Sequence, residues 1–245
     1  MKNRLCLLIL ALCLLGACKI MTETDRINAA LPTLSAEELL AEGVRRFDAK
    51  EYDRSRLYLK FLYENFPNSP QAVEALLKMA DAYALEVGID NKMEARQRFG
   101  DFYSRFPQAP QAEYALFMQG KLSLAMKPHP DKDPANTNLA YQTFTRYLQI
   151  FPEGPHAAEA REGIRTCQDH MAAHEYSVAL FYFRRHAYRA TLSRLEFLQR
   201  SFPEYGDMGK VHLLFARAYQ ALGDETTAQE YFRKAEEAGV KLEKS

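Results

Sequence analysis

The chain has 245 residues and a formal net charge of zero, with 32 basic and 32 acidic side chains. Proteins that bind nucleic acid carry an excess of basic charge to neutralise phosphates, and this balance argues against nucleic acid as a partner. The chain is long enough to bury a sizeable hydrophobic core.

Residues 1–17 have the features of a secretory signal peptide. An apolar run of 11 residues, Leu5 to Leu15, follows the basic residues Lys2 and Arg4. A membrane-spanning helix needs about 20 apolar residues, so this run is too short to be one. A basic start, a short apolar middle and small residues before a cleavage site are typical of a signal that is removed.

The end of this signal predicts lipidation. Leu15-Gly16-Ala17-Cys18 resembles the bacterial lipobox, in which the chain is cut before the cysteine and that cysteine is acylated. We therefore expect Cys18 to become the lipid-modified N-terminus. An ordinary signal peptide that happens to contain cysteines, such as Cys6 and Cys13, is the alternative.

Residues 18–34 are expected to form the acylated N-terminus and a tether. This stretch shows no strong periodicity and contains Pro32. The alternative is that the part after Ile27 folds back onto the body of the protein. Once the signal is removed and Cys18 is acylated, Cys167 is the one thiol left, so no intramolecular disulfide can form.

A short phrase recurs along the rest of the chain. It reads NFPNSP, RFPQAP, IFPEGP and SFPEYG, with Phe-Pro pairs at 66, 106, 151 and 202. Before each phrase a small residue is followed by large apolar residues four and seven positions later. The sets are Ser55, Leu59, Leu62; Ala95, Phe99, Phe102; Ala140, Phe144, Tyr147; Thr191, Leu195, Leu198; and, without the proline, Ala228, Phe232, Ala235.

This spacing predicts helices. Positions i, i+4 and i+7 lie on one face of a helix, and the small residue lets a neighbouring helix approach closely. Proline cannot continue the helix and ends it. The pattern resembles the second helix of the tetratricopeptide repeat, and Gly43, 12 residues before Ser55, fits its first helix. We expect an all-α fold, a right-handed superhelical solenoid of about five tetratricopeptide-like helix pairs.

Two stretches interrupt the repeats. Residues 126–138 contain three prolines and are expected to form a loop inside the third repeat. Residues 155–185 contain no proline after Pro155 and are read as one long helix or two nearly collinear ones. The predicted division is residues 35–153 for repeats 1–3 and residues 154–245 for the long helix and repeats 4–5.

The best candidate for a metal site is Cys167, His170 and His174, which have positions i, i+3 and i+7 in a predicted helix. Such side chains can face one direction and suit a transition metal, but no fourth ligand is evident. No phosphate-binding loop or catalytic motif is found elsewhere. We therefore expect no catalytic residue, metal or cofactor, and keep an enzyme or metal protein as a rival interpretation.

Together, the lipobox, the repeats and three further segments resemble the BamD (ComL-type) family of lipoproteins of the outer-membrane β-barrel assembly (BAM) complex. The segments are EYALFMQGKLSLA (113–125), DKDP (131–134) and HEYSVALFYFRRHAYRATLSRLE (174–196). EYSVA is the most specific piece, because the generic repeat does not prescribe it. The chain departs from better-known members near Ile89-Asp90-Asn91 and in the length of its insert.

The resemblance implies a scaffold on the periplasmic face of the outer membrane, held there by its lipid. It implies that the C-terminal repeats dock onto a POTRA domain of BamA. It also implies that the N-terminal repeats receive unfolded outer-membrane β-barrel proteins, whose signal is an extended segment ending in an aromatic residue. Other BAM lipoproteins are further partners in this family.

Arg194 is the residue predicted to bind BamA. It lies next to Leu195 at the edge of the buried face, and it matches the family's arginine that meets an acidic residue of the last POTRA domain. A pair with Glu196 or another nearby carboxylate is the alternative, although Glu196 is only two residues on and points away. The main rival function is another periplasmic tetratricopeptide adaptor, such as a Tol-Pal cell-division coordinator, which usually has no lipobox.

Overall fold

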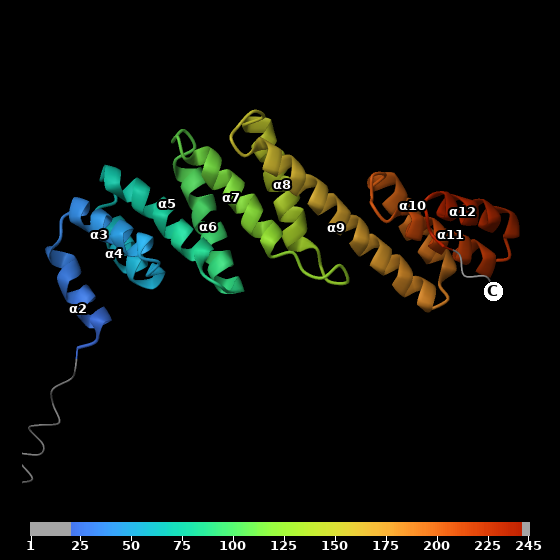
Figure 1. Cartoon of the computed structure of the whole chain (residues 1–245), viewed down its shortest axis with the longest axis horizontal. Helices are drawn as coiled ribbons and strands as arrows, with labels where there is room; N and C mark the ends of the chain where they lie inside the picture. Colours follow the sequence, from blue (N-terminus) through green and yellow to red (C-terminus); the bar gives the residue numbers. More distant parts are fainter. Residues whose placement is uncertain (1–20, 242–245) are drawn as a thin grey trace, which may run out of the picture. The chain divides into compact units, whose positions relative to one another are not determined.

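The computed structural model describes residues 21–241, and this part of the chain contains helices and no strand. The predicted signal peptide and Cys18 lie outside the described residues. No helix in residues 21–241 is long and apolar enough to cross a membrane. The predicted all-α class is confirmed (Figure 1).

The chain divides into two compact units, one ending at Ala82 and one beginning at Tyr83. The first unit contains α2 (Glu23–Ala30), the 3-10 helix η1 (Leu31–Thr33), α3 (Ala36–Asp48), α4 (Tyr52–Asn65) and most of α5 (Pro70–Leu85). The second unit contains α6 (Ile89–Arg105), α7 (Ala112–Ala125), α8 (Ala135–Ile150), α9 (Ala157–Arg184), α10 (Tyr188–Ser201), α11 (Met208–Ala221) and α12 (Glu225–Glu237). From α6 onward each helix packs against the next one in the chain.

The recurring Phe-Pro phrase ends four helices, as predicted. In each case the phenylalanine caps the helix, with φ between −135° and −125° and ψ between 50° and 61°. A following proline disfavours the helical conformation of the residue before it. The phrase therefore stops α4, α6, α8 and α10 one residue before its phenylalanine.

The predicted repeat positions form the core. All of the small and large apolar positions of the five sets are buried except Phe232, which is partly buried. In the first repeat the Ser55 hydroxyl donates a hydrogen bond of 2.7 Å to the carbonyl oxygen of Gly43. A Cβ atom on Gly43 would lie 2.6 Å from a methyl carbon of Leu59, so α3 and α4 need the glycine to approach this closely.

The third repeat packs more tightly. The Phe144 ring of α8 lies between Gly120 of α7 and Gly163 of α9. A Cβ atom on Gly120 would lie 2.8 Å from the ring, and one on Gly163 would lie 2.5 Å from it. Since neither distance leaves room for a carbon atom, the two glycines are needed to accommodate one aromatic side chain.

The predicted tether is shorter than residues 18–34. Helix α2 begins with a capping box between Thr22 and Asp25, and it contacts α4. Ile27 and Leu31 are each only 5% exposed. The alternative, in which the chain after Ile27 packs onto the body, therefore describes this part correctly. Eight residues with one buried side chain give too little periodicity for sequence reasoning to recognise the helix.

The two predicted irregular stretches are also refined. Helix α8 begins at Ala135, so the loop covers 126–134 and residues 135–138, which we expected in the loop, are helical. Helix α9 is continuous over 28 residues, which resolves the choice between one helix and two. The predicted boundary between 153 and 154 falls in the turn before α9, within the second compact unit.

The turn between α11 and α12 is capped on both sides. Gly223 adopts a φ of 82°, and the Asp224 side chain accepts a hydrogen bond of 3.1 Å from the backbone N–H of Thr227. Leu222, the C-cap of α11, is 44% exposed.

Candidate functional site

Arg194 lies on the outer side of α10, between the buried residues Thr191 and Leu195. Its guanidinium Nη1 is 3.2 Å from the Oε2 atom of Glu175 on α9. The arginine side chain is 45% exposed and the Glu175 side chain 15%. The partner is therefore a nearby carboxylate, the alternative left open by the sequence, but it comes from the neighbouring helix rather than from Glu196.

Glu175 holds Arg194 above a packed core. On α9 the side chains of Tyr176, Leu180 and Phe183 pack with the buried residues Leu195 and Leu198 of α10 and with Val211 and Phe215 of α11. Because these helices are fixed by apolar contacts, the position of the guanidinium is set by the fold. Sequence reasoning missed Glu175, since the residue lies 19 positions away and no helix-face rule links the two.

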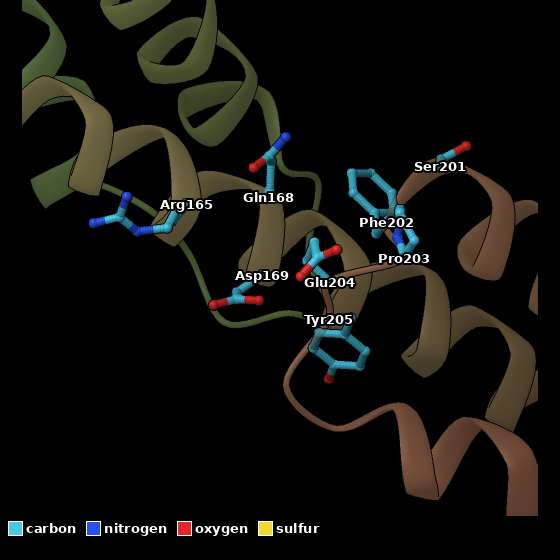
Figure 2. Close-up of a pocket in the computed structure, with 8 residues that line it drawn as sticks. All are labelled: Arg165, Gln168, Asp169, Ser201, Phe202, Pro203, Glu204 and Tyr205. Carbon is cyan, nitrogen blue, oxygen red and sulfur yellow. The ribbon is translucent and has the colours of Figure 1, made fainter. Parts of the chain in front are cut away.

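Figure 2 shows a small pocket on the same helix pair. Helix α9 provides one wall with Arg165, Gln168 and Asp169, and the turn after α10 provides the other with the fourth Phe-Pro phrase, Ser201, Phe202, Pro203, Glu204 and Tyr205. Its volume of about 190 Å³ is below the roughly 300 Å³ at which small-molecule sites begin. Burial raises the pKa of Tyr205 to about 12.

The chemistry of this pocket is mixed. One guanidinium and two carboxylates line it, and Arg165 is already paired with Glu162 on its own helix. The pocket offers no charge complementarity to a strongly cationic or a strongly anionic ligand. The pocket therefore serves best as part of the contact between α9 and the turn after α10.

The candidate metal ligands have a different role in the structure. The ring Nε2 of His170 donates to the carbonyl oxygen of Pro128 at 2.8 Å, and Nδ1 of His174 donates to the carbonyl oxygen of Pro130 at 2.8 Å. The other ring nitrogen of His170 is 3.1 Å from the hydroxyl of Thr137. The two histidines thus attach the loop 126–134 to α9.

Cys167 is fully buried, and burial raises the pKa of its thiol to about 11. A neutral buried thiol is a poor metal ligand and a poor nucleophile. Within residues 21–241 no group of three or more His, Cys, Asp or Glu side chains is arranged to hold a metal ion. No local sequence signal indicates that the two histidines anchor the loop, because the loop lies more than 40 residues earlier in the chain.

A polar cluster that the sequence did not reveal joins α7, α8 and the turn before α9. The Glu113 carboxylate accepts hydrogen bonds from the Tyr147 hydroxyl and from Nδ1 of His156, the latter at 2.9 Å. The His156 ring stacks on Phe117 with ring centres 4.3 Å apart. Burial raises the pKa of Tyr147. These residues stabilise the third repeat rather than face a ligand, since Tyr147 is fully buried.

Comparisons with known proteins agree with this helix-pair architecture. A family model described as "Outer membrane lipoprotein" (YfiO) matches residues 32–234. The chain is 29% identical to "Outer membrane protein assembly factor BamD" of Neisseria meningitidis (Z2491) over 91% of this chain and 86% of that protein. It is 30% identical to the Neisseria gonorrhoeae protein of the same name, covering 74% of this chain and 70% of that one.

A third relative of that name, from Vibrio cholerae, is 23% identical over 88% of this chain and 90% of its own length. The family model spans α3 to α11 and most of α12, and this range includes the Arg194–Glu175 pair and every buried repeat position except Ala235. The resemblance inferred from the sequence is thereby confirmed, and the chain belongs to the YfiO family of outer membrane lipoproteins.

Proposed function

We propose that this protein is an outer membrane protein assembly factor, a scaffold of the BAM complex on the periplasmic face of the outer membrane. The observation that carries the proposal is the family match over residues 32–234, because relatives covering most of the chain bear that name. An all-helical repeat scaffold suits such a role, since its stacked helix pairs present long surfaces to protein partners.

The proposed anchor is the acylated Cys18. Its support is the sequence Leu15-Gly16-Ala17-Cys18 at the end of a signal peptide. Each buried methylene contributes about 0.8 kcal/mol, so two or three acyl chains hold a protein on a membrane far more firmly than one. Between Cys18 and the first described helix, which begins at Glu23, only a short link is left, so the helical body would lie close to the membrane surface.

Arg194 is the proposed contact with a POTRA domain of BamA. A guanidinium has five N–H donors, and Glu175 accepts from one nitrogen, Nη1. The remaining donors of this 45% exposed side chain can meet an acidic residue of the partner. Glu175 would then act as an internal support that orients Arg194 before the partner arrives.

The helix pairs in residues 35–153 are proposed to receive the extended signal of unfolded β-barrel proteins. Helical grooves recognise peptides through pockets for side chains at regular spacing. The support for this part of the proposal is the family resemblance together with the stacked helix pairs of this region.

The test is a binding titration of residues 19–245 with the cognate POTRA domains. We expect Arg194→Ala to weaken binding by at least about thirtyfold and Arg194→Glu to weaken it further, because a desolvated interface arginine costs about 2–5 kcal/mol when removed. Arg200→Glu, a reversal at another exposed position of α10, is the matched control and should bind as the wild type does. Wild-type affinity for Arg194→Glu would contradict the assignment of this surface.

A further inference from the structure

The turn between α9 and α10 is strongly basic although the chain as a whole is neutral. From 176 to 195 the sequence contains four arginines and one histidine but no aspartate or glutamate. Arg184, Arg185 and Arg189 are all exposed. Within the described part of the chain, no ion pair joins any of these three to a carboxylate, whereas Arg194 is paired. Their charges are therefore available to a partner.

The turn between α3 and α4 occupies the equivalent place in the first repeat. Phe47 and Tyr52 make an edge-to-face contact there with ring centres 5.4 Å apart, and Phe183 and Tyr188 make the same contact at 5.5 Å. Both turns also contain a residue other than glycine in the left-handed conformation, Lys50 with φ 61° and His186 with φ 60°. The two turns thus share a backbone and an aromatic pair.

At two equivalent positions the charges are opposite. Where the first repeat has Asp48 and Asp53, the same distance before Leu59, the fourth repeat has Arg184 and Arg189 before Leu195. Since the turns share a left-handed residue and an aromatic pair, that shared geometry does not by itself require either charge at these positions. The difference points to a role of the basic turn outside the fold itself.

The arginines at the first turn are paired with carboxylates within the protein. Arg46 is 2.9 Å from Glu42 and 2.6 Å from Glu51, and Arg54 is 3.2 Å from Glu51. Glu42 also pairs with Arg45 at 2.5 Å. The turn after α9 has no such glutamates. The arginines of the first turn are therefore paired within the protein, whereas Arg184, Arg185 and Arg189 have no such pair within residues 21–241.

A groove continues from the basic turn along α9. It has a volume of about 520 Å³ and is lined by Ser177, Val178, Leu180, Phe181, Tyr182 and Arg184, with Asp131 from the loop 126–134. Phe181 is 50% exposed, and the guanidinium of Arg185 lies over its ring at 4.6 Å from the ring centre. Asp131 is the one carboxylate of this lining, and it is paired with His129 at 2.7 Å.

The backbone at His186 is left-handed, as it is at Lys50 in the first repeat, so this conformation is a feature of the shared turn and not of the basic surface alone. The His186 Nδ1 atom is hydrogen-bonded to the Tyr188 hydroxyl at 2.8 Å, and this contact links two side chains of the turn between Arg185 and Arg189.

We propose that this surface, Arg184, Arg185 and Arg189 with the groove over Phe181, binds an acidic extended segment of a partner protein. Guanidinium groups bind carboxylates in a planar, two-pronged geometry, so three unpaired arginines fit several acidic side chains. The groove accepts an apolar side chain of the same segment. A flat lipid surface would meet the arginines but would leave the groove unfilled. This surface is separate from Arg194 and goes beyond the function proposed above.

The test measures the binding of fluorescent peptides of about 12 residues to the mature protein by fluorescence anisotropy. The first peptide alternates Asp and Ser around a central Leu, the second has Ser in place of Leu, and the third has Lys in place of every Asp. We expect the first to bind most tightly, the third not to bind, and binding of the first to weaken at least tenfold between about 20 mM and 300 mM salt.

Two double variants identify the site. Arg184→Gln with Arg185→Gln should weaken binding of the acidic peptide at least tenfold, which is about 1.4 kcal/mol. Arg200→Gln with Arg233→Gln removes two exposed arginines from the C-terminal parts of α10 and α12, and should change binding less than about twofold. Glutamine avoids placing a negative charge at a helix C-terminus, so both variants are expected to fold.

Phe181→Ala tests the groove. In this variant the Leu and Ser peptides should bind equally, whereas the wild type should prefer the Leu peptide. Equal loss of binding in both double variants would overturn the proposal, because it would reflect net charge alone. Arginine-dependent binding to phosphatidylglycerol vesicles without binding of the acidic peptide would also overturn it, and would assign the turn to a membrane surface.

Discussion

The two compact units are stabilised by different kinds of interaction. In the first unit, charged side chains on the surface connect the helices. Glu23 of α2 pairs with Arg46 of α3 and with Arg54 of α4, and Arg46 also pairs with Glu51 in the turn between these helices. Such exposed pairs contribute about 0–1 kcal/mol each and are screened by salt. The packing of α2 in this unit is therefore sensitive to solution conditions.

In the second unit, the helices pack through buried aromatic rings that lie against glycines. Phe144 fills the space between Gly120 and Gly163, and Tyr147 reaches a carboxylate that is shared with the turn before α9. These contacts are shielded from water, so salt affects them little. The comparison teaches that repeats with a buried core in both units can make their further contacts either as ion pairs at the surface or as close packing inside.

The largest expected effect is in the closely packed unit. Gly163→Ala places a carbon atom 2.5 Å from a ring that Gly120 confines on its other side, so the ring cannot move away. We expect the free energy of unfolding to fall by about 2–3 kcal/mol, the upper part of the range for overpacked cores. Chemical denaturation would measure it. Phe144→Leu should restore part of the stability of Gly163→Ala, and no restoration would show that the ring is not the obstacle.

Alkaline pH should weaken the same unit. Burial raises the pKa of Cys167 from about 9 to about 11, so the unfolded chain loses this proton first and stability falls as the pH rises from 9 to 11. At pH 10 the thiol should account for about 1 kcal/mol of the loss. Thermal unfolding of Cys167→Ala, compared with the wild type across this pH range, isolates its share. Parallel curves for the two proteins would contradict the assignment.

Gly43→Ala provides the matching test in the first unit, with a smaller effect. The new carbon atom would meet the end of the Leu59 side chain, which can turn aside as the Phe144 ring cannot. Alanine also favours the helix over glycine by about 1 kcal/mol, which offsets much of the clash. We expect a loss of at most about 1 kcal/mol by denaturation. A loss as large as that of Gly163→Ala would remove the distinction between the two units.

The smallest effect should come from acid. Hydrogen bonds from Arg45 lower the pKa of Glu42, and those from Arg46 lower the pKa of Glu51. The stability from these pairs is complete above a pH of about 4.5 and is lost as the pH falls through the lowered values. Hydrogen exchange in α2 and α3 should therefore rise in acid, and also in about 1 M salt, before it rises in α7 and α8.

Much of the helical architecture could be predicted from the sequence, because its signals are local. The positions of Ser55 and Leu59, or of Ala140 and Phe144, follow from helix periodicity, and the helix ends follow from the effect of proline on its neighbour. The start of α2 was missed because its few residues carry only Ile27 as a buried side chain. A helix of this length is stable only through its contacts with other parts of the fold, and these cannot be read from its own residues.

The candidate site was less accessible to sequence reasoning. Arg194 could be placed at the edge of a buried face, but its pairing with Glu175 depends on how α9 lies against α10. The roles of His170 and His174 depend on the path of a loop more than 40 residues earlier in the chain. Contacts between distant segments need the fold, whereas spacing along one helix does not.

Helix α9 has a consequence for how this chain can change in length. Its first part packs against α8 and its second part against α10. One continuous helix of 28 residues, roughly 42 Å long, therefore fixes the rotation of α10 about the helix axis relative to α8. One residue inserted at its middle would turn everything that follows by about 100° and separate the two faces. Natural length variation should therefore collect in the loop 126–134, and in α9 it should come only in steps that restore the turn, three or four residues at a time.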